Sequence, residues 1–318
     1  MSQILLPARP QILKNDFSIG ICAADHATGL RELVATIRDE AYPEGLSLNS
    51  IIIVASALDD EAHALLNTLR SQPNNLVVIE EPTRRGKAEA INRIIDLTTG
   101  RFLVLVNSDA QPERGAVSKL LSTIAAGEGI GMVSASPTLG PSEGVVGAVL
   151  ELMWQAHNEC LLTLNKKGMI NHCCDELVAV RLDAIDKLPP DTVNDGAFLA
   201  GAAYRNGYSI CYCESAHIRI DLPHRLTDVL MQRRRILFGH LQIKNRVGET
   251  PRTVESMLVT NPVLSLSILV RTLVKSPKSI LALPVAVVAE GISVAMAIVD
   301  NTTSRTKHVP WARFGSKS

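Results

Sequence analysis

Aromatic residues, net charge and cysteine are all scarce in this chain of 318 residues. Phe, Trp and Tyr make up 3% of it, so the aromatic platforms that bind single-stranded nucleic acid are not expected. Lys and Arg together number 32, as do Asp and Glu, so no net charge attracts nucleic acid. Six cysteines are too few for a disulfide scaffold, and the N-terminal residues lack the long apolar stretch of a secretory signal. We expect a reducing, cytosolic setting and no nucleic-acid partner.

Short apolar strands alternate with amphipathic helices in the first third of the chain. Strands are expected at 17–23, 50–55, 76–79 and 102–106, and helices at 26–38, 59–69 and 87–97. Fully apolar strands that alternate with helices predict an α/β fold, in which helices cover both faces of a mostly parallel sheet. In such sheets, ligands bind at the carboxyl ends of the strands.

The stretch 84–109 contains both parts of a nucleotide-diphosphate site. The basic turn Arg84-Arg85-Gly86-Lys87 opens a helix, and the strand that follows ends at Asn107-Ser108-Asp109. Cations and the free N–H groups of a helix start attract phosphate, and a carboxylate can hold a divalent ion that bridges phosphate oxygens. We therefore predict that the diphosphate of a nucleotide binds here.

Four polar residues are candidates for direct contacts with the same ligand. Asp25 and Asp60 follow the first two strands, where contacts with a base or ribose are expected. Lys87 and Asn92 are predicted to serve the nucleotide from the helix 87–97, although a plain exposed helix would have the same pattern.

The C-terminal third is apolar. Residues 279–299 carry a single charge, Glu290, and their length suffices to cross a bilayer core of roughly 30 Å. Residues 257–275 are less apolar and suit an interfacial helix or half of a helical hairpin, and the tail from Arg305 to Lys317 is basic. We expect membrane lipid as a partner and the cytoplasmic face of the cell membrane as the location, with a buried helix pair as the alternative.

From Phe17 to Gly239 the order of motifs resembles an inverting family 2 glycosyltransferase of the GT-A fold. The resemblance rests on the first strand, the helix RRGKAEAIN, the strand end at Asp109, and Asn194-Asp195 followed by a helix with Gln232 and Arg235. It implies a Rossmann-like, mostly parallel sheet flanked by helices, with apolar C-terminal helices. The implied units are a GT-A domain at 1–245, a membrane-associated or transmembrane segment at 246–300 and a basic tail at 301–318.

The resemblance also implies roles for residues. Asp195 would be the catalytic base, with a helix N-cap as its alternative role. Asp109 would bind Mg²⁺ or Mn²⁺, and Asn107, Gln232 and Arg235 would contact a nucleotide-diphosphate sugar, Arg235 at the diphosphate. The acceptor is unknown, although an apolar C-terminal segment would suit a lipid-linked or envelope glycan.

The chain departs from the family pattern at two places. Asn107 stands where the first acid of a D-x-D pair is expected, which removes one anionic metal ligand. Ile236 stands in place of the Trp of Q-x-x-R-W, which argues against a processive polymerase. A non-catalytic nucleotide-sugar-binding scaffold therefore stays open. A nucleotidyltransferase is disfavoured, because Ala23-Ala24-Asp25-His26 stands where its glycine-rich loop is expected.

Overall fold

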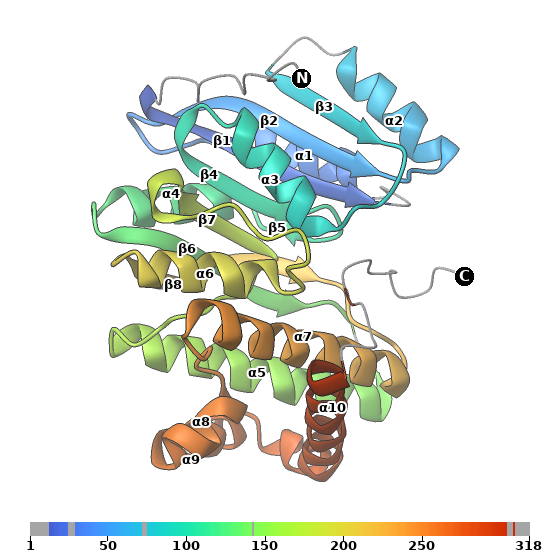
Figure 1. Ribbon diagram of the computed structural model, residues 1–318, viewed down its shortest axis with the longest axis vertical. Coiled ribbons are helices and arrows are strands. Elements are labelled where there is room, and N and C mark those ends of the chain that lie inside the picture. Colours follow the sequence, from blue (N-terminus) through green and yellow to red (C-terminus); the bar gives the residue numbers. More distant parts are fainter. Residues whose placement is uncertain (1–12, 25–28, 72–74, 142, 304–307, 309–318) are drawn as a thin grey trace.

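The computed structural model describes residues 13–24, 29–71, 75–141, 143–303 and 308 (Figure 1). Asp25 and most of the basic tail lie outside the described residues. Within them, eight strands form one sheet in the order β3-β2-β1-β4-β7-β6-β8-β5. The strands are β1 Leu13–Ala24, β2 Ser47–Ser56, β3 Leu76–Glu81, β4 Gly100–Asn107, β5 Gln111–Pro112, β6 Ile130–Leu139, β7 Leu177–Arg181 and β8 Ser209–Ile220.

The first four long strands are parallel, as their sequence predicts. β1 pairs in parallel with β2 and β4, and β2 pairs in parallel with β3. Residues Ile51 to Ala55 of β2 are fully buried, because helices cover both faces of the sheet. The predicted helix 87–97 has the same bounds in the structure, and the four strands extend beyond their expected ranges. The helix expected at 26–38 begins only at Leu30, and the one expected at 59–69 runs from Asp60 to Arg70.

β7 breaks the parallel order. It runs antiparallel to β4 on one side and to β6 on the other, while β6 and β8 are parallel to each other. Its amino end therefore lies at the edge where β4 ends. The backbone N–H of Asn107 donates to the carbonyl oxygen of Glu176 at 3.1 Å, which brings the residues just before β7 beside the end of β4.

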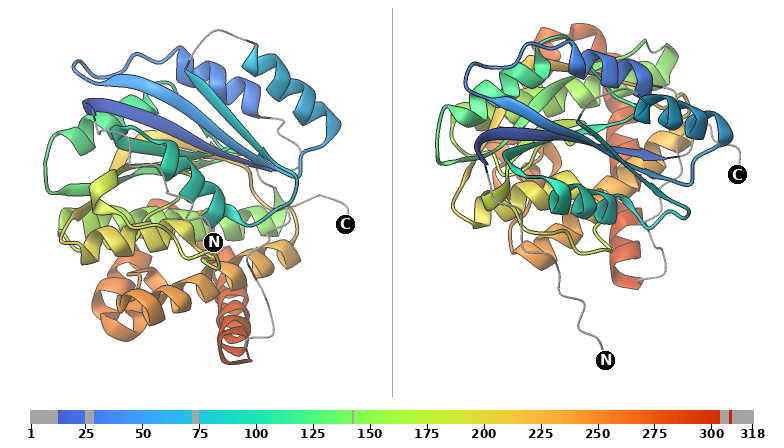
Figure 2. Two further views of the ribbon diagram at one scale, coloured as in Figure 1. Left: turned by 45° about the horizontal axis from the view of Figure 1, so that its top comes forward. Right: turned by 90° about the horizontal axis from the view of Figure 1, so that it is seen from above.

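Two helical layers enclose the sheet, as the two turned views show (Figure 2). One face is covered by α1 (Leu30–Arg38), α2 (Asp60–Arg70) and α4 (Ala116–Ala125). The other is covered by α3 (Lys87–Leu97) and α6 (Asp195–Arg205), together with the second half of α5 (Gly144–Lys166). Helix α7 (Leu226–Val247) packs against α6, where Gly239 allows a close approach because a Cβ there would lie 2.5 Å from that of Asn194.

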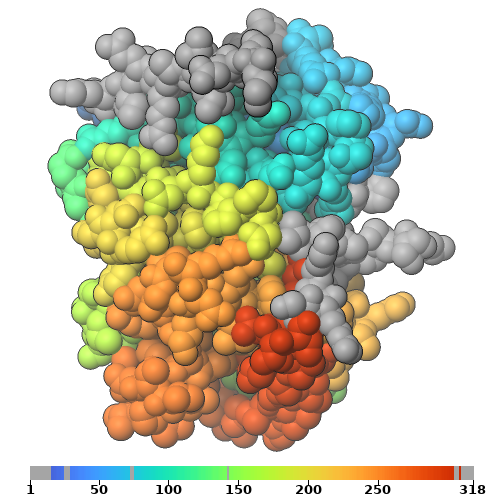
Figure 3. Space-filling view, viewed as in Figure 1, coloured from blue at the N-terminus to red at the C-terminus, as the bar shows by residue number. Residues whose placement is uncertain are grey.

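The C-terminal helices gather at one end of the molecule, away from β1 to β3 (Figure 3). They are α8 (Val254–Thr260), α9 (Pro262–Lys275) and α10 (Leu283–Thr303), with the 3-10 helix Pro277–Ala282, η2, before α10. A continuous helix over 257–275 does not form, because Asn261 ends α8 and Pro262 begins α9. The apolar stretch 279–299 is likewise divided between η2 and α10.

Two arginines of α7 fix α10 to the rest of the chain. Arg233 pairs with Glu290 of α10 at 2.7 Å and with Glu255 of α8 at 2.9 Å. Arg234 binds both carboxylate oxygens of Asp300 at 2.5 Å. Both arginines are therefore held in ion pairs within the protein.

Candidate functional site

Lys87 lies between two carboxylates at the carboxyl edge of the sheet. Its Nζ atom is 2.7 Å from Asp195 Oδ2 and 2.9 Å from Asp175 Oδ2. Gly86 precedes the helix with φ of 108°, a left-handed conformation that admits glycine readily and turns Lys87 into the site. Gly196 lets the two acids come together, since a Cβ there would lie 2.3 Å from that of Asp175.

The two carboxylates have opposite pKa shifts. Burial raises the pKa of Asp195, an effect that the charge of Asp175 increases and that of Lys87 opposes. For Asp175, burial is outweighed by Lys87, and its pKa is lowered. Arg235 also favours the charged form of both acids. Two acids whose surroundings separate their pKa values are typical of a site with one proton acceptor and one permanently charged partner.

Asp195 is not the N-cap of α6. Asn194 holds that position, and its side-chain oxygen accepts from the backbone N–H of Ala197 at 3.0 Å. The alternative interpretation of Asp195 as a helix cap is therefore wrong. Its buried carboxylate, only 7% exposed, faces Lys87 instead.

A second acidic group lies beside the first, at the end of β4. Asn107 Nδ2 donates to Glu176 Oε2 at 2.6 Å. Burial raises the pKa of Glu176 to about 8, and the charges of Asp175 and Asp109 add to the shift. The acid missing at position 107 thus has a counterpart in space, contributed by the residue before β7.

These groups fit a hard divalent cation by their chemistry. Asp109 and Glu176 offer carboxylate oxygens and Asn107 an amide oxygen, which are the ligand types that Mg²⁺ and Mn²⁺ prefer. A buried carboxylate with a raised pKa also indicates excess negative charge, which a cation would neutralise. The described residues contain no preformed group of three or more His, Cys, Asp or Glu ligands, so diphosphate oxygens and water would complete the shell.

The other predicted residues are distributed around this edge. Asp60 is exposed in the first turn of α2. Asn92 uses both polar atoms of its amide on the backbone of Leu188, at 2.7 and 2.8 Å, so it fixes a loop. Half-buried Arg235 donates from Nε to the backbone oxygen of His308 at 3.4 Å, and Gln232 is half-buried three residues earlier. Contacts of these residues with a donor stay predictions, as does that of Asp25.

Asp175 and Glu176 were missed by the sequence interpretation. The sequence of 175–181 predicts a strand that includes both acids and gives them no role in the site. Their signal was present, since an acid pair precedes an apolar strand. Its value became visible only with the antiparallel direction of β7, because a parallel strand would place its start at the opposite edge.

Three histidines continue the site beyond Asp175. The rings of His157, His172 and His240 stand edge to face, with centroids 5.6 and 6.2 Å apart. Burial lowers the pKa of His157 to about 4 and of His172 and His240 to about 3. These rings are therefore neutral and add no positive charge to the site.

The chain matches a known protein family. The family described as Glycosyl transferase family 2 matches residues 18–188, more than half of the chain. The chain belongs to glycosyl transferase family 2. This confirms the predicted family, and the matched region contains Lys87, Asp109, Asp175 and Glu176 but ends before Asp195. Comparison with curated protein sequences gives no match.

A solved structure of a glycosyltransferase shares the fold. A mannosyltransferase from Pyrobaculum calidifontis, in complex with GDP-Man and Mn²⁺, superposes with a TM-score of 0.61 and 18% identity, over 94% of this chain and 90% of that one. The predicted GT-A fold is thereby confirmed, including the C-terminal apolar helix. Glucosyl-3-phosphoglycerate synthase from Mycobacterium tuberculosis, with Mn²⁺, UDP and phosphoglyceric acid, has 18% identity and a TM-score of 0.49, and covers 74% of this chain and 79% of that one.

Proposed function

We propose that this family 2 chain transfers a sugar from a nucleotide-diphosphate donor to an acceptor hydroxyl with inversion. The observation that carries the proposal is the buried carboxylate of Asp195, held by Lys87 at 2.7 Å beside a second acid whose pKa is lowered. A base whose pKa is raised toward neutrality accepts a proton more effectively than an ordinary aspartate does.

The reaction needs one proton acceptor and one stabilised leaving group. The acceptor hydroxyl gives its proton to a carboxylate oxygen of Asp195, and its oxygen attacks the anomeric carbon. The bond from that carbon to the diphosphate oxygen breaks, and its electron pair leaves with the nucleotide diphosphate. Attack from the face opposite the leaving group inverts the anomeric configuration.

The leaving diphosphate carries negative charge that the chain can balance. Mg²⁺ or Mn²⁺ bound by Asp109 and Glu176 would supply Lewis-acid stabilisation of the phosphate oxygens. Arg235 and the N-terminus of α3 provide further positive potential at this edge. The complex of the Pyrobaculum enzyme with GDP-Man and Mn²⁺ supports a nucleotide sugar and a divalent ion as ligands.

The protein acts at the cytoplasmic face of the cell membrane in this proposal. Support comes from Pro277–Thr303, which contains an 18-residue window with a mean hydropathy of 2.1, and only 28% of that window is buried. In the described segments, it is the one helix whose length and composition would allow it to cross a membrane. The buried residues of α10 recur every three or four positions and end at Asp300, so its charged side faces α7. The exposed aliphatic residues of α8 to α10 are Leu258, Val259, Val263, Leu266, Val270, Val274, Ile280, Leu281, Val287, Val288, Ile292, Ile298 and Val299.

This arrangement favours a helix that lies in the membrane surface over one that crosses it. Crossing would carry Glu290 into hydrocarbon or break its pair with Arg233, and either change is costly. Lying in the interface leaves both ion pairs of α7 in place and exposes the aliphatic face of α10 to lipid.

The test begins with finding the donor by thermal shift, with nucleotide diphosphates and their sugars, with and without Mn²⁺. Transfer is then measured as nucleotide diphosphate released with glycosylated product, whose anomeric configuration is read by NMR. Asp195→Asn should abolish transfer and leave donor binding, whereas Asp109→Asn should weaken Mn²⁺-dependent donor binding. Full transfer activity in both variants would refute these roles, and Mn²⁺-dependent binding without turnover in the parent chain would favour the scaffold.

A further inference from the structure

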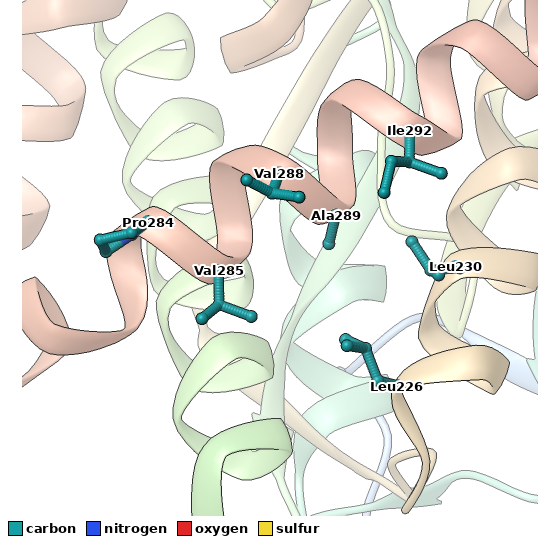
Figure 4. Close-up of a pocket in the computed structure, with 7 residues that line it drawn as sticks. All are labelled: Leu226, Leu230, Pro284, Val285, Val288, Ala289 and Ile292. Atoms are coloured by element: carbon teal, nitrogen blue, oxygen red, sulfur yellow. The ribbon is translucent and has the colours of Figure 1, made fainter.

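An aliphatic groove separates the first half of α10 from the first turns of α7 (Figure 4). Leu226 and Leu230 line it from α7, and Val285, Val288 and Ile292 line it from α10, with Ala289 at its base. The groove has a volume of about 280 Å³ and a lining without a polar side chain. Ser293 donates to the carbonyl oxygen of Leu230 at 3.4 Å, so the two helices are joined next to the groove.

We propose that this groove binds the hydrocarbon chain of a lipid-carried acceptor, either an alkyl or a polyprenyl chain. The inference rests on the proposed transferase function and names the class of its acceptor. The volume lies near the lower limit of roughly 300 Å³ for small-molecule pockets, which suits a segment of a single chain. A hydrocarbon chain bound against this apolar lining is removed from water, whereas a sugar would find no hydrogen-bond partner there.

The position of the groove favours a membrane lipid over a second protein surface. Its rims are exposed, since Val288 is 60% and Ile292 45% exposed. They continue into the exposed aliphatic face of α10, which the proposed function places against lipid. A chain can therefore enter from the hydrocarbon layer without crossing water.

The same helix leads from the groove to the reaction site. Leu230 and Arg235 are five residues apart on α7, about 7.5 Å along the axis at 1.5 Å per residue. Arg235 in turn acts on the charges of Asp175 and Asp195. Because five residues turn the two side chains about 140° apart, the polar head of a lipid bound in the groove would pass around α7 to reach the catalytic carboxylate.

Binding is tested without turnover, in detergent-free buffer, with dansyl-labelled n-alkanols of six to twelve carbons below their micelle concentration. The affinity should rise about fourfold per added methylene and level off when the groove is full. Val288→Asp and Leu226→Asp should each weaken binding of the longest probe at least tenfold. Val287→Asp is the matched control, because Val287 is 61% exposed but lies outside the groove, and its affinity should change by less than twofold.

Several results would overturn the proposal. Equal loss in all three variants would mean adsorption on the whole apolar face, and no saturable binding would leave the groove without its ligand. If the parent protein forms dimers, Val288→Asp abolishes them and the probes have no effect, the groove binds a second copy of the protein. Circular dichroism and the melting temperature must stay at parent values for each variant that is scored.

A transfer assay separates this proposal from the proposed function. The KM of acceptors that share one head group should fall with chain length in the parent chain and in Val287→Asp, but not in Val288→Asp. Transfer with a KM independent of chain length, together with absent probe binding, refutes the groove and leaves the transferase standing. Saturable probe binding without transfer to any acceptor refutes the transferase while the groove keeps its hydrocarbon ligand.

Discussion

Replacing Lys87 by Met should disable the site by changing the protonation of Asp195. The substitution keeps the length of the side chain and removes the ammonium that lies within 3 Å of two acids. An opposite charge at this range lowers a carboxyl pKa by about one to three units, so its loss should raise the pKa of Asp195 by that amount. The shift adds to the rise that burial already causes, because Lys87 is the largest opposing influence.

The same change should destabilise the fold. Removing one partner of a buried ion pair costs about 3 to 5 kcal/mol, and the 28% exposure of Lys87 favours the lower end of that range. Asp175→Asn in the same chain removes one of the two facing carboxylates and should restore part of the loss. Urea unfolding of Lys87→Met, of Asp175→Asn and of the double variant, each compared with the parent, gives the coupling free energy between the two residues.

The pH profile of kcat/KM provides the assay for protonation. Its acidic limb should move up by one to three pH units in Lys87→Met, with a tenfold rate loss per unit below the limb. Lys87→Arg keeps the charge and is the control, with a limb close to that of the parent. An unmoved limb in Lys87→Met, or one displaced to lower pH, would refute the coupling between Lys87 and Asp195.

Three further predictions concern other parts of the chain. The pKa of Glu176 is about 8 in the fold against an ordinary 4.5, so the folded chain binds more protons between these values and its unfolding free energy should fall as pH rises from 4.5 to 8. Glu176→Gln should flatten that slope in urea titrations and weaken Mn²⁺ binding measured by calorimetry. Arg233→Met should cost about 3 to 5 kcal/mol in unfolding free energy, and a second change, Glu290→Leu, should recover part of it. Gly100→Ala should lower the melting temperature through a cost of about 1 to 3 kcal/mol, because its Cβ would lie 2.3 Å from the backbone oxygen of Asp16.

The fold was predictable where local pattern and global topology agree. The run from Ile51 to Ala55 is apolar and mostly β-branched, which is typical of a strand covered on both faces, and β2 has that environment. The helix 87–97 was predictable because a glycine precedes it and Thr98 follows it. The direction of β7 was not predictable, since strand propensity is the same for either direction and the choice depends on pairing with β4 and β6.

The site was predictable only from its continuous segments. Lys87 and Asp195 carry signals in their own sequence, a basic helix start and an acid at a helix opening. Their contact joins residues more than a hundred positions apart, and no local pattern encodes it. Glu176 shows the same limit, because its value as a partner of Asn107 arises from an antiparallel neighbour. In the sequence, Asn107 in place of an aspartate removes a carboxylate from the site. In the structure, the carboxylate of Glu176 lies beside Asn107.

The three consecutive arginines of α7 have a consequence for how the chain can be shortened. Successive side chains on an α-helix point about 100° apart, so Arg233 and Arg234 reach α8 and α10 while Arg235 turns toward the carboxylates. The helix cannot rotate or slide to withdraw Arg235 without stretching both anchored neighbours. The C-terminal helix therefore fixes the orientation of the Arg235 guanidinium in the reaction site. A truncation made to remove apolar surface would release that orientation even with no lipid present.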